Sequence, residues 1–172
     1  STVSAVLAVK AIPVLVDVKE DTYCIDVDRI KEAITHKTKA VIPVHMAGNV
    51  CDMDEINDIA AKYNIAVIED SSHAHGSSWK GKGAGSIGIL GTFSFQNAKL
   101  LTSGEGGIVL ANNDEMLERL LLESNCGRSE KDTNYQHVLI GTNARLSEFQ
   151  GAVLRVQLGR LDEQIAVREE NY

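Results

Sequence analysis

Short apolar runs alternate along the chain with longer segments in which apolar residues recur every three or four positions. The short runs predict β-strands at 13–18, 40–45, 66–70, 91–95 and 107–111. The longer segments predict helices at 26–35, 54–63, 114–123 and 147–172. Strands that alternate with helices are typical of an α/β domain. We therefore expect a mostly parallel sheet flanked by helices.

Polar residues support two of the predicted helix starts. Asp26 stands at the head of the first helical segment, where a carboxylate can accept a hydrogen bond from a free backbone N–H. Ser147 is followed three positions later by Gln150, the spacing of a capping box. We therefore expect the last helix to begin at Ser147.

The composition restricts the class of protein. The chain has 172 residues, 44% of them hydrophobic, which is enough for the core of one domain. Its net charge of −7 argues against nucleic acid and anionic membranes as partners. The three cysteines have no metal-binding or redox spacing, no apolar run approaches the ~18 residues of a membrane span, and the N-terminus does not resemble a signal peptide. We expect a reduced, cytoplasmic protein.

The first candidate for chemistry is Asp70, at the end of the apolar strand predicted at 66–70. The carboxyl ends of parallel strands border the crevice in which α/β proteins bind ligands. The alternative is structural, because an aspartate at this position can simply cap the turn through Ser71 and Ser72. The other strand-end polar residues, His73, Ser94 and Lys99, favour a site.

Lys99 is the second candidate. Most lysines are solvated surface charges, but this one follows a predicted strand and precedes Leu100, Leu101 and the glycine-rich stretch at 104–107. Apolar neighbours partly shield its amine from water. A lysine that forms a Schiff base with an aldehyde, and a carboxylate that keeps a ring nitrogen protonated, are the main parts of a pyridoxal 5'-phosphate site. Lys99 and Asp70 outline such a site.

Four segments in a fixed order extend this outline into a family resemblance. They are VIEDSSHAHG at 67–76, GTFSFQNAK at 91–99, LTSGEGG at 101–107 and GTNARLSEFQ at 141–150. Shorter stretches at 12–17, 21–26 and 41–48 agree with them. On these motifs the chain resembles the DegT/DnrJ/EryC1/StrS aminotransferases, which have the large domain of fold-type I pyridoxal phosphate enzymes, over essentially its whole length.

The resemblance implies a role for each matching residue. Lys99 would form the Schiff base with pyridoxal 5'-phosphate and then move a proton as acid and base. Asp70 would pair with the ring nitrogen, His73 would lie near the ring, and Ser94 would bind the phosphate. Asn143 matches an asparagine that reaches the phosphate of the neighbouring subunit, which implies a homodimer with shared active sites.

Other polar residues in these motifs receive smaller roles. Arg145 and Glu148 also match the family, and we interpret them as structural. His45 and His75 stay unassigned. For His73 the alternative is a turn histidine that contacts no ligand.

The family relationship also implies a reaction. An amino acid, glutamate or glutamine, would load the cofactor with nitrogen, and a keto sugar or keto cyclitol would receive it, in antibiotic, cell-surface polysaccharide or amino-sugar biosynthesis. A branch that deoxygenates sugars has histidine in place of Lys99, so aminotransfer is favoured. The motif details resemble the 3-amino-5-hydroxybenzoate synthase and inosose aminotransferase subgroup, and the former enzymes perform an aromatising dehydration with the same lysine.

The resemblance further predicts how the chain is organised. Residues 1–146 would be part of the cofactor-binding large domain, and 147–172 one long helix leading toward a C-terminal small domain. The family's N-terminal phosphate loop precedes the matched region. Two alternatives follow: a truncated, catalytically inactive fragment, or a non-enzymatic regulatory protein on the same fold.

Overall fold

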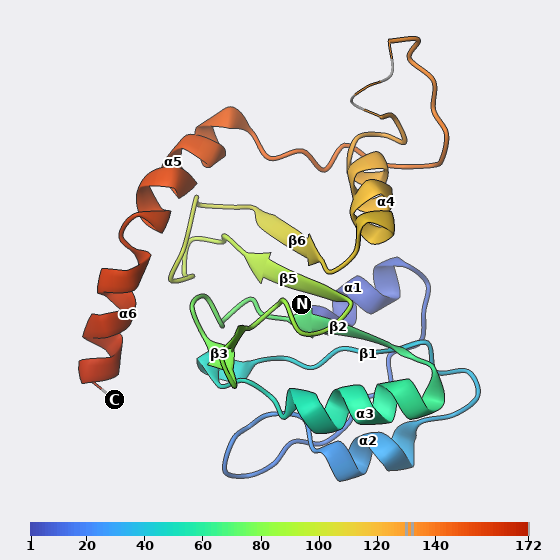
Figure 1. Ribbon diagram of the computed structural model, residues 1–172, viewed down its shortest axis with the longest axis vertical. Helices are drawn as coiled ribbons and strands as arrows, with labels where there is room; N and C mark the ends of the chain where they lie inside the picture. Colours follow the sequence, from blue (N-terminus) through green and yellow to red (C-terminus); the bar gives the residue numbers. More distant parts are fainter. Residues whose placement is uncertain (130, 132, 172) are drawn as a thin grey trace. The chain divides into compact units, whose positions relative to one another are not determined.

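The computed structural model describes residues 1–129, 131 and 133–171 (Figure 1). The chain forms two compact units, Ser1–Phe93 and Ser94–Tyr172. Tyr172, the predicted end of the last helix, lies outside the described residues.

A parallel sheet forms the centre of the first unit. Strand β2 (Ala66–Asp70) pairs on one side with β1 (Ala40–Val41) and on the other with β5 (Leu90–Ser94). Regular pairing in the strand predicted at 40–45 stops early because Pro43 has no N–H to donate. Val44 still forms an isolated parallel bridge with Asp70, so this segment follows β2 to its end.

Two helices bury their apolar faces in the first unit. Helix α3 (Met53–Tyr63) packs on β2, and α2 (Val27–Ala33) lies beside α3 (Figure 1). Asp26 caps α2 by accepting a hydrogen bond from the Asp28 N–H at 3.0 Å, as predicted. The core consists mainly of side chains from these helices, β1, β2 and two cysteines: Cys24, Val27, Ile30, Val41, Cys51, Met53, Ile56, Ile59, Ala60 and Val67. This core supports β2 from one face.

Smaller elements complete the first unit. They are helix α1 (Thr2–Ala8), the 3-10 turn η1 (Met46–Gly48) and a hairpin of β3 (Ser78–Trp79) and β4 (Lys82–Gly83). None of these was predicted from the pattern. They are short, so few positions are available to establish a period.

The prediction of a strand at 13–18 is wrong. The segment has no regular strand pairing, and its ladder contact is an isolated bridge between Val18 and Ile25. Ile12 and Leu15 are 88% and 80% exposed. The Asp26 N–H donates to the Asp17 carbonyl at 2.9 Å beside this bridge, but a strand needs a neighbouring strand that continues the ladder, and the described residues form none along 13–18.

The second unit contains strand β6 (Gly107–Ala111) and helices α4 (Asp114–Ser124), α5 (Glu148–Leu158) and α6 (Leu161–Glu170). Helix α4 packs against β6 and is capped by Asn113, which accepts from the Met116 N–H at 2.8 Å. The predicted capping box is confirmed: Ser147 accepts from the Gln150 N–H at 3.3 Å, and Gln150 accepts from the Ser147 N–H at 3.0 Å.

The single long helix predicted at 147–172 is wrong, because the chain breaks into α5 and α6 at Gly159 and Arg160. Glycine in a helix interior costs about 1 kcal/mol relative to alanine, so it is a favourable place for a break. No helix in the described part of the chain is both long and apolar enough to span a membrane.

Candidate active site

Asp70 is the last residue of β2, and its backbone is fixed from both sides. Its N–H donates to the Pro43 carbonyl at 2.9 Å, and its carbonyl accepts from the His45 N–H at 3.1 Å. On the other side it lies in register with Thr92 of β5. The predicted strand-end position is therefore confirmed, and the half-buried side chain projects from a rigid element.

Both oxygens of the Asp70 carboxylate accept hydrogen bonds. The Thr2 hydroxyl donates to Oδ2 at 2.6 Å, and the Ser72 N–H donates to Oδ1 at 3.2 Å. Burial by itself would raise the pKa of Asp70. Hydrogen bonds from Ser72 and Thr2, together with the nearby charge of His73, outweigh this effect and lower the pKa below its ordinary value of 3.8. Asp70 is therefore a carboxylate at neutral pH. Its contact with the Ser72 N–H also caps the turn, so the structural alternative and an ionised carboxylate are compatible.

His73 lies on the turn that follows β2. The turn is closed by a hydrogen bond from the Ala74 N–H to the Ser71 carbonyl at 2.8 Å, and the His73 side chain is exposed. The first unit thus brings His73 close enough for its charge to act on Asp70. An exposed imidazole beside an ionised carboxylate is available for contact with a ligand.

Glu69, the neighbour of Asp70, points to the opposite face of β2 and is fully buried. Its carboxylate accepts from the N–H groups of Gly85, Ile87 and Gly88 at 2.8, 2.6 and 2.6 Å, and from His45 at 2.9 Å. Burial would raise the pKa of Glu69, but these hydrogen bonds lower it below its ordinary value of 4.5. The buried charge therefore holds the 85–88 loop against the strand that carries Asp70.

His45, left unassigned from the sequence, belongs to this network. The Cys51 N–H donates to Nδ1 at 3.3 Å, so the ring proton lies on Nε2, which faces Glu69. The sequence carries one signal for this network. Alternate residues of a strand lie on the same face, so Glu69 shares the buried face of the apolar Val67. His75 is also buried, with its ring centroid 5.1 Å from that of Phe93, and is part of the packing.

Lys99 lies in the second unit on a turn that begins directly after β5. Its N–H donates to the Gln96 carbonyl at 2.9 Å, and the Gln96 side chain accepts from the Ala98 N–H at 2.9 Å. The Gln96 N–H donates in turn to the Ser94 hydroxyl at 3.3 Å. Gln96 therefore connects the two predicted cofactor residues of this unit, Ser94 and Lys99.

The surroundings of Lys99 agree with the expected shielding from water. The lysine is half-buried, as is Leu100, while Leu101 is buried. The glycine-rich stretch approaches the same strand end, because the Phe95 N–H donates to the Gly106 carbonyl at 2.8 Å. The lysine thus stands on a turn that is tied to its surroundings at several points.

Asn143 has an exposed side chain in the loop before α5. It forms an isolated bridge with Asn125, and its Oδ1 accepts from the Arg145 N–H at 3.4 Å. Arg145 donates to the Asn125 side chain at 2.7 Å, and Glu148 lies in the first turn of α5, where a negative charge favours the helix. These contacts agree with the structural roles predicted for Arg145 and Glu148.

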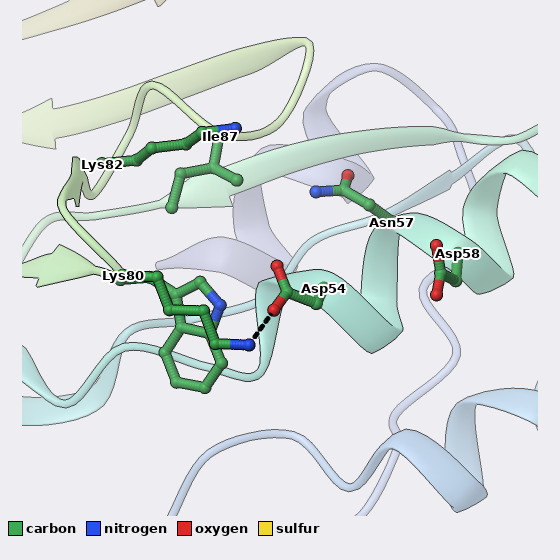
Figure 2. Close-up of a pocket in the computed structure, with 7 residues that line it drawn as sticks. Asp54, Asn57, Asp58, Lys80, Lys82 and Ile87 are labelled. Atoms are coloured by element: carbon green, nitrogen blue, oxygen red, sulfur yellow. Dashed lines mark hydrogen bonds and ion pairs between the residues drawn. The ribbon is translucent and has the colours of Figure 1, made fainter.

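A pocket of about 380 Å³ lies elsewhere in the first unit, beside α3 and the β3–β4 hairpin (Figure 2). Two of its lining residues, Lys80 and Asp54, form an ion pair (Figure 2). The Lys80 ammonium also lies 5.3 Å from the centre of the Trp79 ring. None of the predicted cofactor residues lines this pocket. Its lining residues are Asp54, Asn57, Asp58, Trp79, Lys80, Lys82 and Ile87. The pocket and the candidate site are therefore different places.

The chain is similar to known enzymes along most of its length. It is 46% identical over 164 residues to 3-amino-5-hydroxybenzoate synthase of Amycolatopsis mediterranei, an alignment of 94% of this chain and 42% of that protein. It is 41% identical over 182 residues to L-glutamine:2-deoxy-scyllo-inosose aminotransferase of Streptoalloteichus tenebrarius, covering 99% of this chain and 42% of that one.

The crystal structure of 3-amino-5-hydroxybenzoic acid synthase matches with a TM-score of 0.94 and 45% identity, over 98% of this chain and 44% of that one. The chain thus spans less than half the length of these relatives. The sequence pattern of one family matches residues 1–172. The chain belongs to the DegT/DnrJ/EryC1/StrS aminotransferase family.

Proposed function

We propose that this chain forms the central part of a pyridoxal phosphate-dependent aminotransferase. The observation that carries the proposal is the ionised, half-buried Asp70 carboxylate at the end of β2, held by Thr2 and Ser72. A fixed carboxylate at a strand end fits the ring nitrogen of the cofactor, because its charge favours the protonated nitrogen. Membership of the family supports the same role.

The other site residues fit the remaining parts of the cofactor. When bound, pyridoxal phosphate supplies an electron sink for the substrate carbon from which a proton is removed. Lys99 would hold the aldehyde end until the amino group of the substrate displaces it, and its released amine would then take that proton and deliver it to the C4' carbon of the cofactor. Ser94 would donate to the phosphate, and His73 would contact the ring. Asn143 would reach the phosphate of a partner subunit, so we also propose a homodimer.

For the substrates we propose an amino acid donor, with glutamine favoured, and a keto cyclitol or keto sugar as acceptor. The 41% identity to L-glutamine:2-deoxy-scyllo-inosose aminotransferase, whose name states both the donor and the acceptor, supports this pair. The 46% identity to 3-amino-5-hydroxybenzoate synthase supports a second candidate, an aromatising dehydration that uses the same lysine. Three further statements stay predictions. Residues 1–146 belong to the large domain, and the protein is cytoplasmic. The third is the pair of alternatives, an inactive fragment or a regulatory protein.

The cofactor proposal is tested by absorbance. The purified chain is titrated with pyridoxal phosphate, reduced with borohydride and digested, and the modified peptide is identified by mass spectrometry. We expect a visible band before reduction and a permanent adduct on Lys99 after it. Lys99→Ala should lose both, whereas the control Lys37→Ala, which removes an exposed lysine, should keep both.

Two results would contradict the proposal. A band that persists unchanged in Lys99→Ala would assign the adduct to surface lysines. No band at all in the parent chain would favour the inactive fragment or the regulatory protein over the enzyme.

A further inference from the structure

The Thr2 hydroxyl donates to Oδ2 of Asp70 at 2.6 Å, across 68 residues of sequence. We propose that Thr2 is a positioning residue: it holds one oxygen of the Asp70 carboxylate and thereby orients the group that faces a protonated ring nitrogen. This inference rests on the proposed function, since it assumes that Asp70 is the partner of that nitrogen. It assigns a role to α1, an element that neither the residue pattern nor the matched motifs include.

The geometry supports a positioning role because the two donors come from different elements. Ser72 belongs to the turn after β2 and holds Oδ1, while Thr2 belongs to α1 and holds Oδ2. The terminal torsion of an aspartate side chain is soft, so a single donor would leave the plane of the carboxylate free to turn. Donors on both oxygens restrict that rotation.

The contact also leaves the carboxylate able to bind a further donor. An ionised carboxylate accepts about four hydrogen bonds, and Thr2 and the Ser72 N–H together use two of these positions. Because the Thr2 hydroxyl acts as the donor, it stabilises the charged form that a protonated ring nitrogen requires. Burial opposes that form, so each donor contributes to keeping Asp70 ionised.

Threonine suits this position for a structural reason. Its branched β-carbon restricts the first side-chain torsion in a helix, so its hydroxyl has few alternative directions. Valine has nearly the same shape without the donor, and serine keeps the donor without the methyl group. These two substitutions therefore separate the hydrogen bond from the packing.

The first measurement needs no cofactor. The carboxyl carbon of Asp70 is titrated by NMR in the full chain, with Asp70→Asn used to identify its resonance. We expect Thr2→Val to raise the pKa of Asp70 and Thr2→Ser to leave it near the value of the parent chain. Thr2→Ala removes the same donor with a good helix-forming residue and should reproduce the effect of Thr2→Val. An unchanged Asp70 titration in both donor-deleting variants would overturn the inference.

The second measurement connects the contact to the cofactor. Pyridoxal phosphate is titrated into the parent chain, Thr2→Val and Thr2→Ser, with circular dichroism to verify the fold. We expect Kd to rise about tenfold in Thr2→Val, the effect of losing a hydrogen bond to a charged group, and to recover in Thr2→Ser. A band in the parent chain with an unchanged Kd in Thr2→Val would contradict the inference alone. No band in the parent chain would contradict the proposed function instead, while the NMR titration would still decide whether Thr2 controls Asp70.

Discussion

Nε2 of His45 lies 2.9 Å from the Glu69 carboxylate, and both side chains are 0% exposed. An ion buried without partners would destabilise the fold, but Glu69 also accepts hydrogen bonds from the backbone of Gly85, Ile87 and Gly88. Since Asp70 directly follows Glu69, the network fixes the strand end from which the candidate cofactor-binding carboxylate projects. The network is thus a structural support for the site.

Glu69→Gln tests that support. The substitution replaces one acceptor oxygen by an NH₂ group, which would face N–H donors and leave them unpaired. We expect the free energy of unfolding in urea to fall by about 3 kcal/mol, as for a broken buried network. The control is Glu32→Gln, which alters an exposed ion pair with Arg29 and should leave the free energy of unfolding nearly unchanged, because solvent screens that pair. Equal effects of the two substitutions would contradict the role of Glu69.

The stability of the fold should also depend on acid pH. Glu69 and Asp70 have pKa values below their ordinary 4.5 and 3.8, so the folded state binds protons less readily than the unfolded state. Their contribution is present above those ordinary values and is lost as the pH falls through the lower folded pKa values. Urea midpoints measured from pH 6 downward should therefore decline below about pH 4.5, and more weakly in Glu69→Gln. A variant profile as steep as that of the parent chain would exclude Glu69 as a source of the decline.

The three cysteines should react at different rates. Burial, with a contribution from Cys24, raises the pKa of Cys51 to about 12, and both of these thiols are buried. Cys126 is half-buried. We expect iodoacetamide to label Cys126 first at pH 8, because the thiolate is the reactive form and access is required.

Mass spectrometry of tryptic peptides distinguishes the three sites. In the native chain Cys126→Ser should abolish rapid labelling, while all remaining cysteines should react in urea. Rapid labelling of Cys51 in the native chain would show that the core around it opens readily.

A pair of glycine substitutions tests the packing of the loop that Glu69 holds. A Cβ added at Gly91 would lie 2.0 Å from the Gly85 carbonyl oxygen, a contact with backbone that cannot move aside cheaply. We expect Gly91→Ala to lower the free energy of unfolding by about 3 kcal/mol or more, measured in urea. Gly151, in α5, has no atom within 4 Å of the added Cβ, so Gly151→Ala should be neutral or stabilise by up to about 1 kcal/mol. A well-tolerated Gly91→Ala would mean that the loop is not packed against β5.

The residue pattern determined much of this protein directly. Strands 66–70 and 107–111, the helix start at Asp26 and the capping box at Ser147 follow from local periods and local hydrogen bonds, and the structure confirms them. The ordered motifs were sufficient to identify the family, because spacing along the chain is itself sequence information. The position of Asp70 at the end of a strand follows from the apolar residues of 66–70 that precede it.

The tertiary structure decided what depends on distant partners. An apolar run at 13–18 looked like a strand, but pairing requires a neighbouring strand that a local pattern cannot reveal. The hydroxyl of Thr2 and the ring of His45 acquire their roles only when folding places them beside Asp70 and Glu69, 68 and 24 residues away. Local periodicity reports which side of an element is buried, whereas hydrogen bonds between residues far apart in the sequence, and the charge states that these bonds set, involve groups that only the fold brings together.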